Sequence, residues 1–318
     1  MNSFISWIGG KKALREIIVQ RFPIEYERYI EVFGGAGWVL FYKKPEEFEV
    51  YNDYNSNLTN LFHTIKYKPV DFIKELGWLP LNGREEFNIL RRWIEQMDFS
   101  LPYLEDEKKI IQRYMNDLEL HEYIELINKQ SSLGDVKRAV IFYKLIRYSY
   151  ASSCDSFSCQ PTDILSIYKT IWSVNRRLNE NGSINKKGKL TDIAGKGVII
   201  ENKDFQALIC HYDRNNAFFY CDPPYYKTES YYDIAFGEKD HYRLRDTLKE
   251  IQGKFMVSYN DCDFIREIYS DYYIEAIERT NNISQRYAPG NMFKEIIITN
   301  YDSSERKNSK PLQIKLNF

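Results

Sequence analysis

Four consecutive residues, Asp222-Pro223-Pro224-Tyr225, could hold an exocyclic amine beside a planar ring. The Asp222 carboxylate and the Pro223 carbonyl can each accept one N–H bond, and the Tyr225 side chain can stack on the ring. The preceding residues 217–221 form an aromatic and apolar run, which is typical of a buried strand. The two prolines end that strand at its carboxyl end, where open α/β sheets bind their ligands. Such a segment is also an ordinary turn after a strand, so the tetrad alone leaves both interpretations open.

A second candidate site lies near the amino terminus, where a strand pattern over 29–33 runs into Gly-Gly-Ala-Gly at 34–37. Glycines allow a ligand to approach the backbone closely beside the start of a helix. The next strand pattern ends at Asp53, where a carboxylate can bind both hydroxyls of a ribose. The glycines form neither G-x-G-x-x-G nor G-x-x-x-x-G-K-[ST], so the ligand need not carry phosphates. S-adenosylmethionine fits this pattern, and a plain tight turn is the alternative.

The composition predicts a globular protein of one large domain or two. The chain has 318 residues, of which 43% are hydrophobic and 16% aromatic. No apolar run is long enough to cross a bilayer, and residues 1–10 lack a signal-peptide pattern. Five scattered cysteines indicate a reducing compartment, so we expect a cytoplasmic location. Cys154 and Cys159 are too far apart for a zinc-binding pair, so we expect no metal.

The net charge of −1 does not exclude a nucleic-acid partner, because the local charge of one face is what meets phosphate. Solvated helix or loop faces are the alternative explanation of each local basic group. These groups are Lys137, Arg138, Lys144 and Arg147; Arg176 and Arg177; and Lys186, Lys187 and Lys189.

Hydrophobic periodicity divides the chain into an α/β part that is interrupted by a mainly helical part. Strand and helix signals alternate before residue 57 and again after residue 198. The polar residues 151–162 predict a loop, as do residues 179–189. The pattern is helical from residue 57 to about 150, most clearly over 84–97, 105–129 and 136–150, and further helices are predicted over 11–21, from Trp38 and over 163–178. Strands are predicted over 29–33, 49–52, 198–201, 217–221 and 254–259.

Taken in order, the motifs resemble those of the Dam-like adenine-N6 DNA methyltransferases, the D12 class or alpha group. Val32 stands where the family has a proline, and the match covers nearly the whole chain outside the helical part. The matching segments are Phe4–Lys11 (F-x-x-W-x-G-G-K), Glu31–Gly37, Asn52–Asn55 (N-D-x-N), Asp204-Phe205 and Asp222–Tyr225 (D-P-P-Y), with 258–260 and 294–301 as closing strands.

The resemblance implies an α/β fold, with a Rossmann-like S-adenosylmethionine-dependent methyltransferase sheet in residues 1–56 plus 163–318. Residues 57–162 would form a helical target-recognition insertion. Lys11 would meet the methionine carboxylate of the cofactor, Asp53 its ribose, and Asp204 with Phe205 its adenine. The other residues that would line the cofactor are Trp7, Gly9, Gly10, Glu31, Phe33, Gly34, Gly35, Gly37 and Asp222.

Several of these residues also have ordinary structural explanations. Trp7 and Phe205 could belong to the core, Lys11 could be a surface lysine, and Asp204 could cap a helix. In the implied reaction, Asp222 and Pro223 accept hydrogen bonds from the adenine N6 and free its lone pair to attack the methyl group. Pro224 keeps the segment rigid, and Tyr225 stacks on the adenine, which must be flipped out of duplex DNA.

The resemblance is weakest around residues 147–163, where the family recognises its DNA target. Arg147 is retained, but Asp155 stands where an arginine suited to guanine is expected, so the GATC specificity is not carried over. Asp155 could accept a hydrogen bond from cytosine N4 or cap the loop. Tyr148 and Tyr150 could insert into the base stack or lie in the core.

The sequence therefore predicts a site-specific adenine-N6 methyltransferase that acts on double-stranded DNA. A cytosine-N4 methyltransferase uses the same amine chemistry, although that class more often has Ser in place of Asp222. A structured RNA substrate and a weakly active DNA-binding regulator with the same fold are further alternatives. We expect a monomer without a membrane segment, either acting alone or as half of a restriction–modification pair with a cognate endonuclease.

Overall fold

The computed structural model describes residues 1–78, 83–96, 135–158, 163–179, 197–227, 236–280 and 292–304. The chain divides into two compact units, each described by itself below. Unit 1 comprises 1–10, 35–37 and 52–202, and unit 2 comprises 11–34, 38–51 and 203–318. The predicted domain boundary at residue 163 does not coincide with this division, because the helix that follows it packs against the helices of unit 1.

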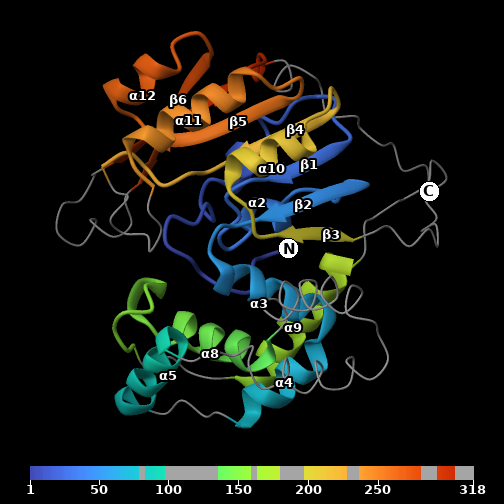
Figure 1. Cartoon of the computed structure of the whole chain (residues 1–318), viewed down its shortest axis with the longest axis vertical. Helices are drawn as coiled ribbons and strands as arrows, with labels where there is room; N and C mark the ends of the chain where they lie inside the picture. Colours follow the sequence, from blue (N-terminus) through green and yellow to red (C-terminus); the bar gives the residue numbers. More distant parts are fainter. Residues whose placement is uncertain are drawn as a thin grey trace, which may run out of the picture. The chain divides into compact units, whose positions relative to one another are not determined.

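Seven strands among the described residues form one sheet in the order β3-β2-β1-β4-β5-β7-β6 (Figure 1). Strand β1 is parallel to β2 and β4, and β4 is parallel to β5. Strand β7 is antiparallel to both β5 and β6, so it begins at the edge where β4 and β5 end. The strands are β1 (Arg28–Glu31), β2 (Phe48–Asn52), β3 (Val198–Glu201), β4 (Ala217–Cys221), β5 (Lys254–Asn260), β6 (Tyr273–Thr280) and β7 (Met292–Thr299).

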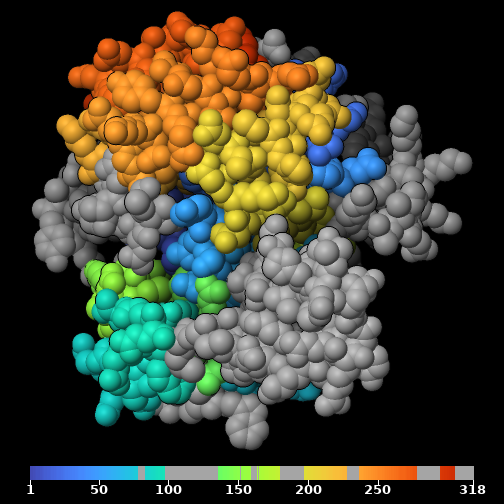
Figure 2. All heavy atoms as spheres, in the orientation of Figure 1, coloured from blue at the N-terminus to red at the C-terminus, as the bar shows by residue number. Residues whose placement is uncertain are grey.

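The helices of unit 2 are short and pack on its strands. Helices α10 and α11 lie side by side over one face of the sheet, and Figure 2 shows them there in yellow and orange. Every residue of β4 is buried, and the Phe22 ring packs 4.6 Å from the Phe218 ring, centroid to centroid. The helices are α1 (Arg15–Val19), α2 (Trp38–Tyr42), α10 (Phe205–Tyr212), α11 (Glu238–Lys249) and α12 (Asp263–Ile268).

Unit 1 is mainly helical, and α8 lies at its centre against α3, α4 and α5. Three side chains cap the described helices of this unit. Asn55 accepts the backbone N–H groups of Asn57 and Leu58, Asp135 accepts that of Arg138, and Asp163 accepts those of Leu165 and Ser166. The helices are α3 (Ser56–Tyr67), α4 (Pro69–Trp78), α5 (Arg84–Gln96), α8 (Val136–Arg147), the 3₁₀ turn η1 (Tyr150–Ser152) and α9 (Ile164–Asn179).

Helix α5 packs on α8 through a small apolar cluster that also reaches the segment after α8. Arg91 of α5 donates a hydrogen bond to the Asp155 carbonyl at 3.1 Å, and the Phe87 ring lies 5.9 Å from the Phe157 ring. Helix α5 therefore supports residues 148–157. The buried members of the cluster are Phe87, Leu90, Ile141, Leu145 and Tyr148.

Most predicted elements are confirmed, with differences at their ends. The helix predicted over 11–21 is wrong in its first part, because residues 12–14 form turns and the first residue of α1 is Arg15. Helices α10 and α12 were not predicted, because 8 and 6 residues are too short for a clear helical period. The helix predicted over 105–129 lies outside the described residues, as do 180–189 of the predicted loop.

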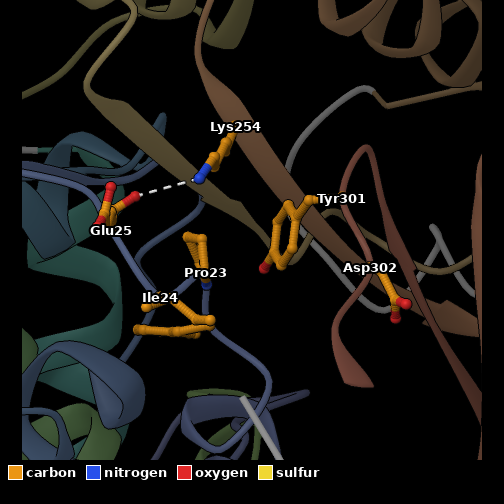
Figure 3. Close-up of a pocket in the computed structure, with 7 residues that line it drawn as sticks. Pro23, Ile24, Glu25, Lys254, Tyr301 and Asp302 are labelled. Atoms are coloured by element: carbon orange, nitrogen blue, oxygen red, sulfur yellow. Dashed lines mark hydrogen bonds between the residues drawn. The ribbon is translucent and has the colours of Figure 1, made fainter. Parts of the chain in front are cut away.

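Figure 3 shows a pocket of about 270 Å³ on unit 2 that has no part in the chemistry predicted from the sequence. Its walls include residues 22–25, which precede β1, together with Lys254 at the start of β5 and Tyr301 after β7. Lys254 Nζ donates a hydrogen bond to the Glu25 carbonyl at 3.3 Å across it. The pocket thus lies at the amino ends of the parallel strands, opposite the edge that carries Asp222.

The apolar cluster between α5 and α8 gives a test of how far α5 contributes to stability. Phe87 is fully buried, so Phe87→Ala should lower the free energy of unfolding by about 3 kcal/mol. Urea denaturation followed by circular dichroism measures this change. Leu165→Ala on α9 is the matched control, because this side chain is 72% exposed. Equal stability of the two variants would show that α5 adds nothing to the core of unit 1.

Candidate active site

Asp222 directly follows β4, and two side chains of unit 2 hold its carboxylate. Lys11 Nζ lies 2.7 Å from Asp222 Oδ1, and Ser258 Oγ donates a hydrogen bond to the same oxygen at 2.8 Å. The Tyr220 hydroxyl lies 3.2 Å from Ser258 Oγ and donates to it, because the Ser258 proton is already engaged. Asp222 Oδ2 has no polar partner among the described residues, so it can accept a hydrogen bond from a ligand.

Lys11 is buried, and its ammonium group has two neighbours in the tetrad. Besides Asp222 Oδ1, Lys11 Nζ lies 4.7 Å from the centroid of the Tyr225 ring, a cation–π contact. The surface alternative for Lys11 is thereby excluded, since only 7% of the residue is exposed. Its predicted contact with a cofactor carboxylate stays a prediction, and the structure adds a pairing with the acid of the tetrad.

The environment of Asp222 raises its pKa. Burial is the main cause, since it disfavours the charged form, and the negative charge of Glu295 acts in the same direction. Lys11 and the hydrogen bond from Ser258 act against it and lower the pKa. The carboxyl group therefore takes up a proton more readily than an exposed aspartate does.

The Tyr225 ring is anchored at its far end by β7. Its hydroxyl donates a hydrogen bond to Glu295 Oε2 at 2.6 Å, and Glu295 is only 2% exposed. Pro223 and Pro224 are buried just before it, so the backbone at the near end is restricted as well. The aromatic group of the tetrad thus has a defined orientation.

Two further predicted residues of unit 2 lie at the carboxyl end of β1. Burial raises the pKa of Glu31 to about 8, against the hydrogen bond that the Tyr29 hydroxyl donates to it at 2.7 Å. Gly34 packs against the buried ring of Tyr51, and a Cβ atom at this position would lie 2.2 Å from a ring carbon. Glycine is therefore required at 34 for space.

Asp204 and Phe205, the two residues predicted to contact the cofactor adenine, are the N-cap and the first residue of α10. The Asp204 side chain accepts the backbone N–H of Gln206 at 3.0 Å, so the capping alternative is confirmed. Arg243 of α11 donates to both Asp204 oxygens, at 2.8 and 2.9 Å, and its guanidinium lies 4.0 Å from the Phe205 ring centroid. The Phe33 ring packs 5.6 Å from the Phe205 ring, so three predicted cofactor residues lie together in unit 2.

In unit 1 a hydrogen bond joins the glycine turn at residues 34–37 to Asp53, the acid that follows β2. The Gly35 N–H donates to Asp53 Oδ2 at 2.8 Å, and the Asn55 N–H donates to Oδ1 at 2.8 Å. Gly35 has a φ of +49°, which glycine adopts without strain. The Trp7 ring lies against Gly35, 3.1 Å from where a Cβ would stand.

The other predicted cofactor-lining glycines of unit 1 lie in the turn at residues 7–10 and in the glycine turn at 34–37. Gly10 donates its backbone N–H to the Trp7 carbonyl at 3.1 Å, and Gly9 and Gly37 have φ values of 74° and 66°. Burial raises the pKa of Asp53 to about 6, against the two backbone hydrogen bonds that lower it. The carboxylate is therefore ionised at neutral pH but protonated in mild acid.

The four predicted DNA contacts lie at the end of α8 and in the segment after it. Tyr148 is 6% exposed and belongs to the apolar cluster with α5, so the structure places its side chain in the core. Tyr150 is 71% exposed, and the Asp155 carboxylate lies 3.6 Å from Arg91 Nη2. Arg147 is half-buried and hydrogen-bonds to Tyr143.

Sequence reasoning missed three residues that hold the predicted ones: Ser258, Glu295 and Arg243. Ser258 and Glu295 lie in segments that were recognised only as closing strands. Both are polar residues within mostly apolar strands. This was a signal that could have been used, because a buried polar group needs a hydrogen-bond partner. Arg243 had no signal of its own, because arginine is common on exposed helix faces.

Comparison with known proteins shows which family the chain belongs to. The model of the D12 class N6 adenine-specific DNA methyltransferase family matches residues 7–283 of the chain. The chain belongs to this family. The seven-stranded α/β sheet confirms the predicted methyltransferase fold.

Individual members of the family match along most of their length. The chain is 25% identical to the type II methyltransferase M1.LlaDCHI of Lactococcus lactis subsp. cremoris, over 95% of this chain and 96% of that protein. It is also 25% identical to the DNA adenine methylase of Haemophilus influenzae, over 92% of each chain. The type II methyltransferase M.CviBI of Paramecium bursaria Chlorella virus NC1A is 23% identical over 86% of this chain and 88% of that protein.

Two further observations concern the described ranges only. They contain no cluster of three or more His, Cys, Asp or Glu side chains that could hold a metal ion. No helix within them combines the length and the apolar character that crossing a membrane requires.

The contact between Gly34 and Tyr51 can be tested by adding a single methyl group. Gly34→Ala should lower the free energy of unfolding by about 1–3 kcal/mol, because the fully buried Tyr51 ring must move. Chemical denaturation measures the change. Gly77→Ala in α4 is the matched control, because a Cβ there meets nothing within 4 Å; it should stabilise the chain by up to about 1 kcal/mol. An unchanged stability of Gly34→Ala would contradict the steric requirement.

Proposed function

We propose that this DNA adenine methyltransferase transfers a methyl group from S-adenosylmethionine to N6 of an adenine flipped out of duplex DNA, within one short recognition sequence. The observation that carries this proposal is how the two oxygens of the Asp222 carboxylate are engaged. Lys11 and Ser258 both engage Oδ1, which leaves Oδ2 for the amine of the target base. The following prolines and Tyr225 supply a carbonyl acceptor and an aromatic ring in fixed positions.

Asp222 and Pro223 would activate the target amine. The lone pair of adenine N6 is delocalised into the ring, and two acceptors that bind its two N–H groups favour a tetrahedral nitrogen with a free lone pair. When bound, S-adenosylmethionine supplies a methyl group on a positively charged sulfur, so no metal or covalent enzyme intermediate is needed. Asp222 accepts the proton that N6 loses after transfer, which its raised pKa favours. Tyr225 stacks on the base and keeps N6 in line with the methyl group.

The residues of the glycine turn fit a nucleoside. Each Asp53 oxygen accepts one backbone N–H and keeps capacity for a second hydrogen bond, so the carboxylate can bind two ribose hydroxyls. Because Gly35 carries no side chain, the Trp7 ring packs where a Cβ would stand, and the Gly35 N–H can hold the Asp53 carboxylate in place. Phe33 and Phe205 offer aromatic surface for an adenine ring, and Asp204 offers an acceptor that Arg243 holds in place.

The remaining features suggest how the enzyme meets its DNA. Residues 57–162 act as the target-recognition insertion, where Arg147, Tyr150 and Asp155 contact duplex DNA. The names of two relatives, type II methyltransferases, support a role in restriction–modification beside a cognate endonuclease. The protein acts in the cytoplasm as a monomer. The acid at position 222, where cytosine-N4 enzymes more often have Ser, favours adenine as the target base.

The first test compares the wild-type chain with Asp222→Ala in cells. Single-molecule sequencing of host DNA should detect methylated adenines within one short motif for the wild type and none for the variant. Cofactor binding by the purified variant should stay within about threefold of wild type, because the loss concerns the amine and not the nucleoside. Asp271→Asn, an exposed acid of unit 2, is the control and should methylate normally. Methylation by Asp222→Ala would refute the mechanism, and modified cytosines would refute adenine specificity.

The pKa of Asp53 gives a second test. Ionised Asp53 accepts the ribose hydroxyls, so the contribution of Asp53 to the affinity for S-adenosylmethionine should be constant above pH 7. It should fall as the pH drops through about 6, where the carboxylate becomes protonated. A loss of about tenfold in affinity by pH 5 is expected, measured by calorimetry. Asp53→Asn should bind more weakly and show no step near pH 6. A variant that keeps the step would show that another group causes it.

A further inference from the structure

Glu295 is a buried carboxylate whose charge helps to raise the pKa of Asp222, and the chemistry above gives it no other role. It lies near the start of β7, opposite Asn260 at the end of β5, and 2% of the residue is exposed. Its Oε2 accepts the hydrogen bond of the Tyr225 hydroxyl at 2.6 Å. Because β7 runs antiparallel, Glu295 reaches the edge of the sheet where β4 presents the tetrad.

Placing a carboxylate here has a free-energy cost, and the hydrogen bond from Tyr225 offsets part of it. A buried charge must be hydrogen-bonded, and an O–H···O⁻ contact of this length is among the stronger hydrogen bonds in proteins. The tyrosine ring is joined to the backbone at one end and to Glu295 at the other. Pro223 and Pro224 restrict the first end, and the Glu295 carboxylate fixes the second. The two restraints together leave the ring little freedom to tilt.

We propose that Glu295 is a positioning residue for methyl transfer, which holds the Tyr225 ring in the orientation that stacks on the extruded base. This inference rests on the function proposed above. It predicts that Glu295 acts on the held base and not on the cofactor. It also predicts that Glu295 acts mainly through the Tyr225 hydroxyl, so most of its effect disappears when that hydroxyl is absent.

A double-mutant cycle tests the second prediction. Tyr225→Phe, Glu295→Ala and the double variant are compared in single-turnover methylation of a duplex carrying the motif found by sequencing. Each single variant should slow transfer by about tenfold, because one charge-assisted hydrogen bond is lost. The double variant should be no slower than the slower single variant, since both remove the same contact. Fluorescence of 2-aminopurine at the target position should fall in parallel, because a base that is held less firmly returns to the base stack of the duplex, where it is quenched.

Controls separate positioning from damage to the fold. Tyr26 and Glu46 form a similar pair in unit 2, with the hydroxyl 2.9 Å from Glu46 Oε1, and they lie before β1 and β2, away from the tetrad. Tyr26→Phe and Glu46→Gln should keep the wild-type rate and fluorescence. The affinity of all variants for S-adenosylmethionine should stay within about twofold of wild type. Glu295→Gln, which keeps an acceptor oxygen, should recover part of the rate and replaces Glu295→Ala in the cycle if the alanine variant does not fold.

Two results would overturn the inference. One is a double variant slowed by about a hundredfold, which means that the two residues act independently. The other is wild-type rate and fluorescence after either substitution of Glu295. A wild-type chain that methylates no adenine would instead refute the proposed function, so the two failures are distinguishable.

Discussion

A carboxylate kept out of bulk water at the end of β4 sets the main requirement that unit 2 has to meet. Burial makes the charged form of Asp222 unfavourable, so the fold must supply a cation and a hydrogen-bond donor within reach. Lys11 comes from the segment before α1 and Ser258 from β5, on the two sides of β4 in the sequence. Both contact one oxygen only. The acid is therefore stabilised without being saturated, which is what a group that must still bind a substrate requires.

The sequence predicted the site best where a polar side chain directly follows a parallel strand. Asp53 and Asp222 follow parallel strands directly, and the rule that such strands end at the ligand-binding edge located both. The rule fails for Glu295, because β7 is antiparallel and brings its beginning, not its end, to that edge. Nothing in the local pattern of residues 292–299 indicates the direction of the strand, so the role of this acid could be seen only in the fold.

The helical part shows the other limit of sequence reasoning. The period of apolar residues predicted α5 nearly to its last residue, but a period does not tell which neighbour an apolar face meets. Tyr148 illustrates this limit. The sequence left an exposed wedge and a core residue as equal alternatives, and contact with Phe87 and Leu90 decided for the core. Tyr150, two positions along, is exposed instead and begins the 3₁₀ turn that follows α8.

The position of β7 has a consequence for the order in which this chain can fold. Strand β6 is made before β7, yet among the described strands its one partner is β7, which inserts between it and β5. Until β7 has been synthesised, β6 has no place in the sheet and β5 has an open edge. The hydrogen-bond acceptor of Tyr225, Glu295, likewise lies 70 residues later in the sequence and is synthesised after it. A nascent chain released before residue 295 would thus carry the complete D-P-P-Y motif, but the Tyr225 ring would lack its hydrogen bond to Glu295. Addition of β7 completes the pairing of β5 and β6 and supplies this hydrogen bond in one late step.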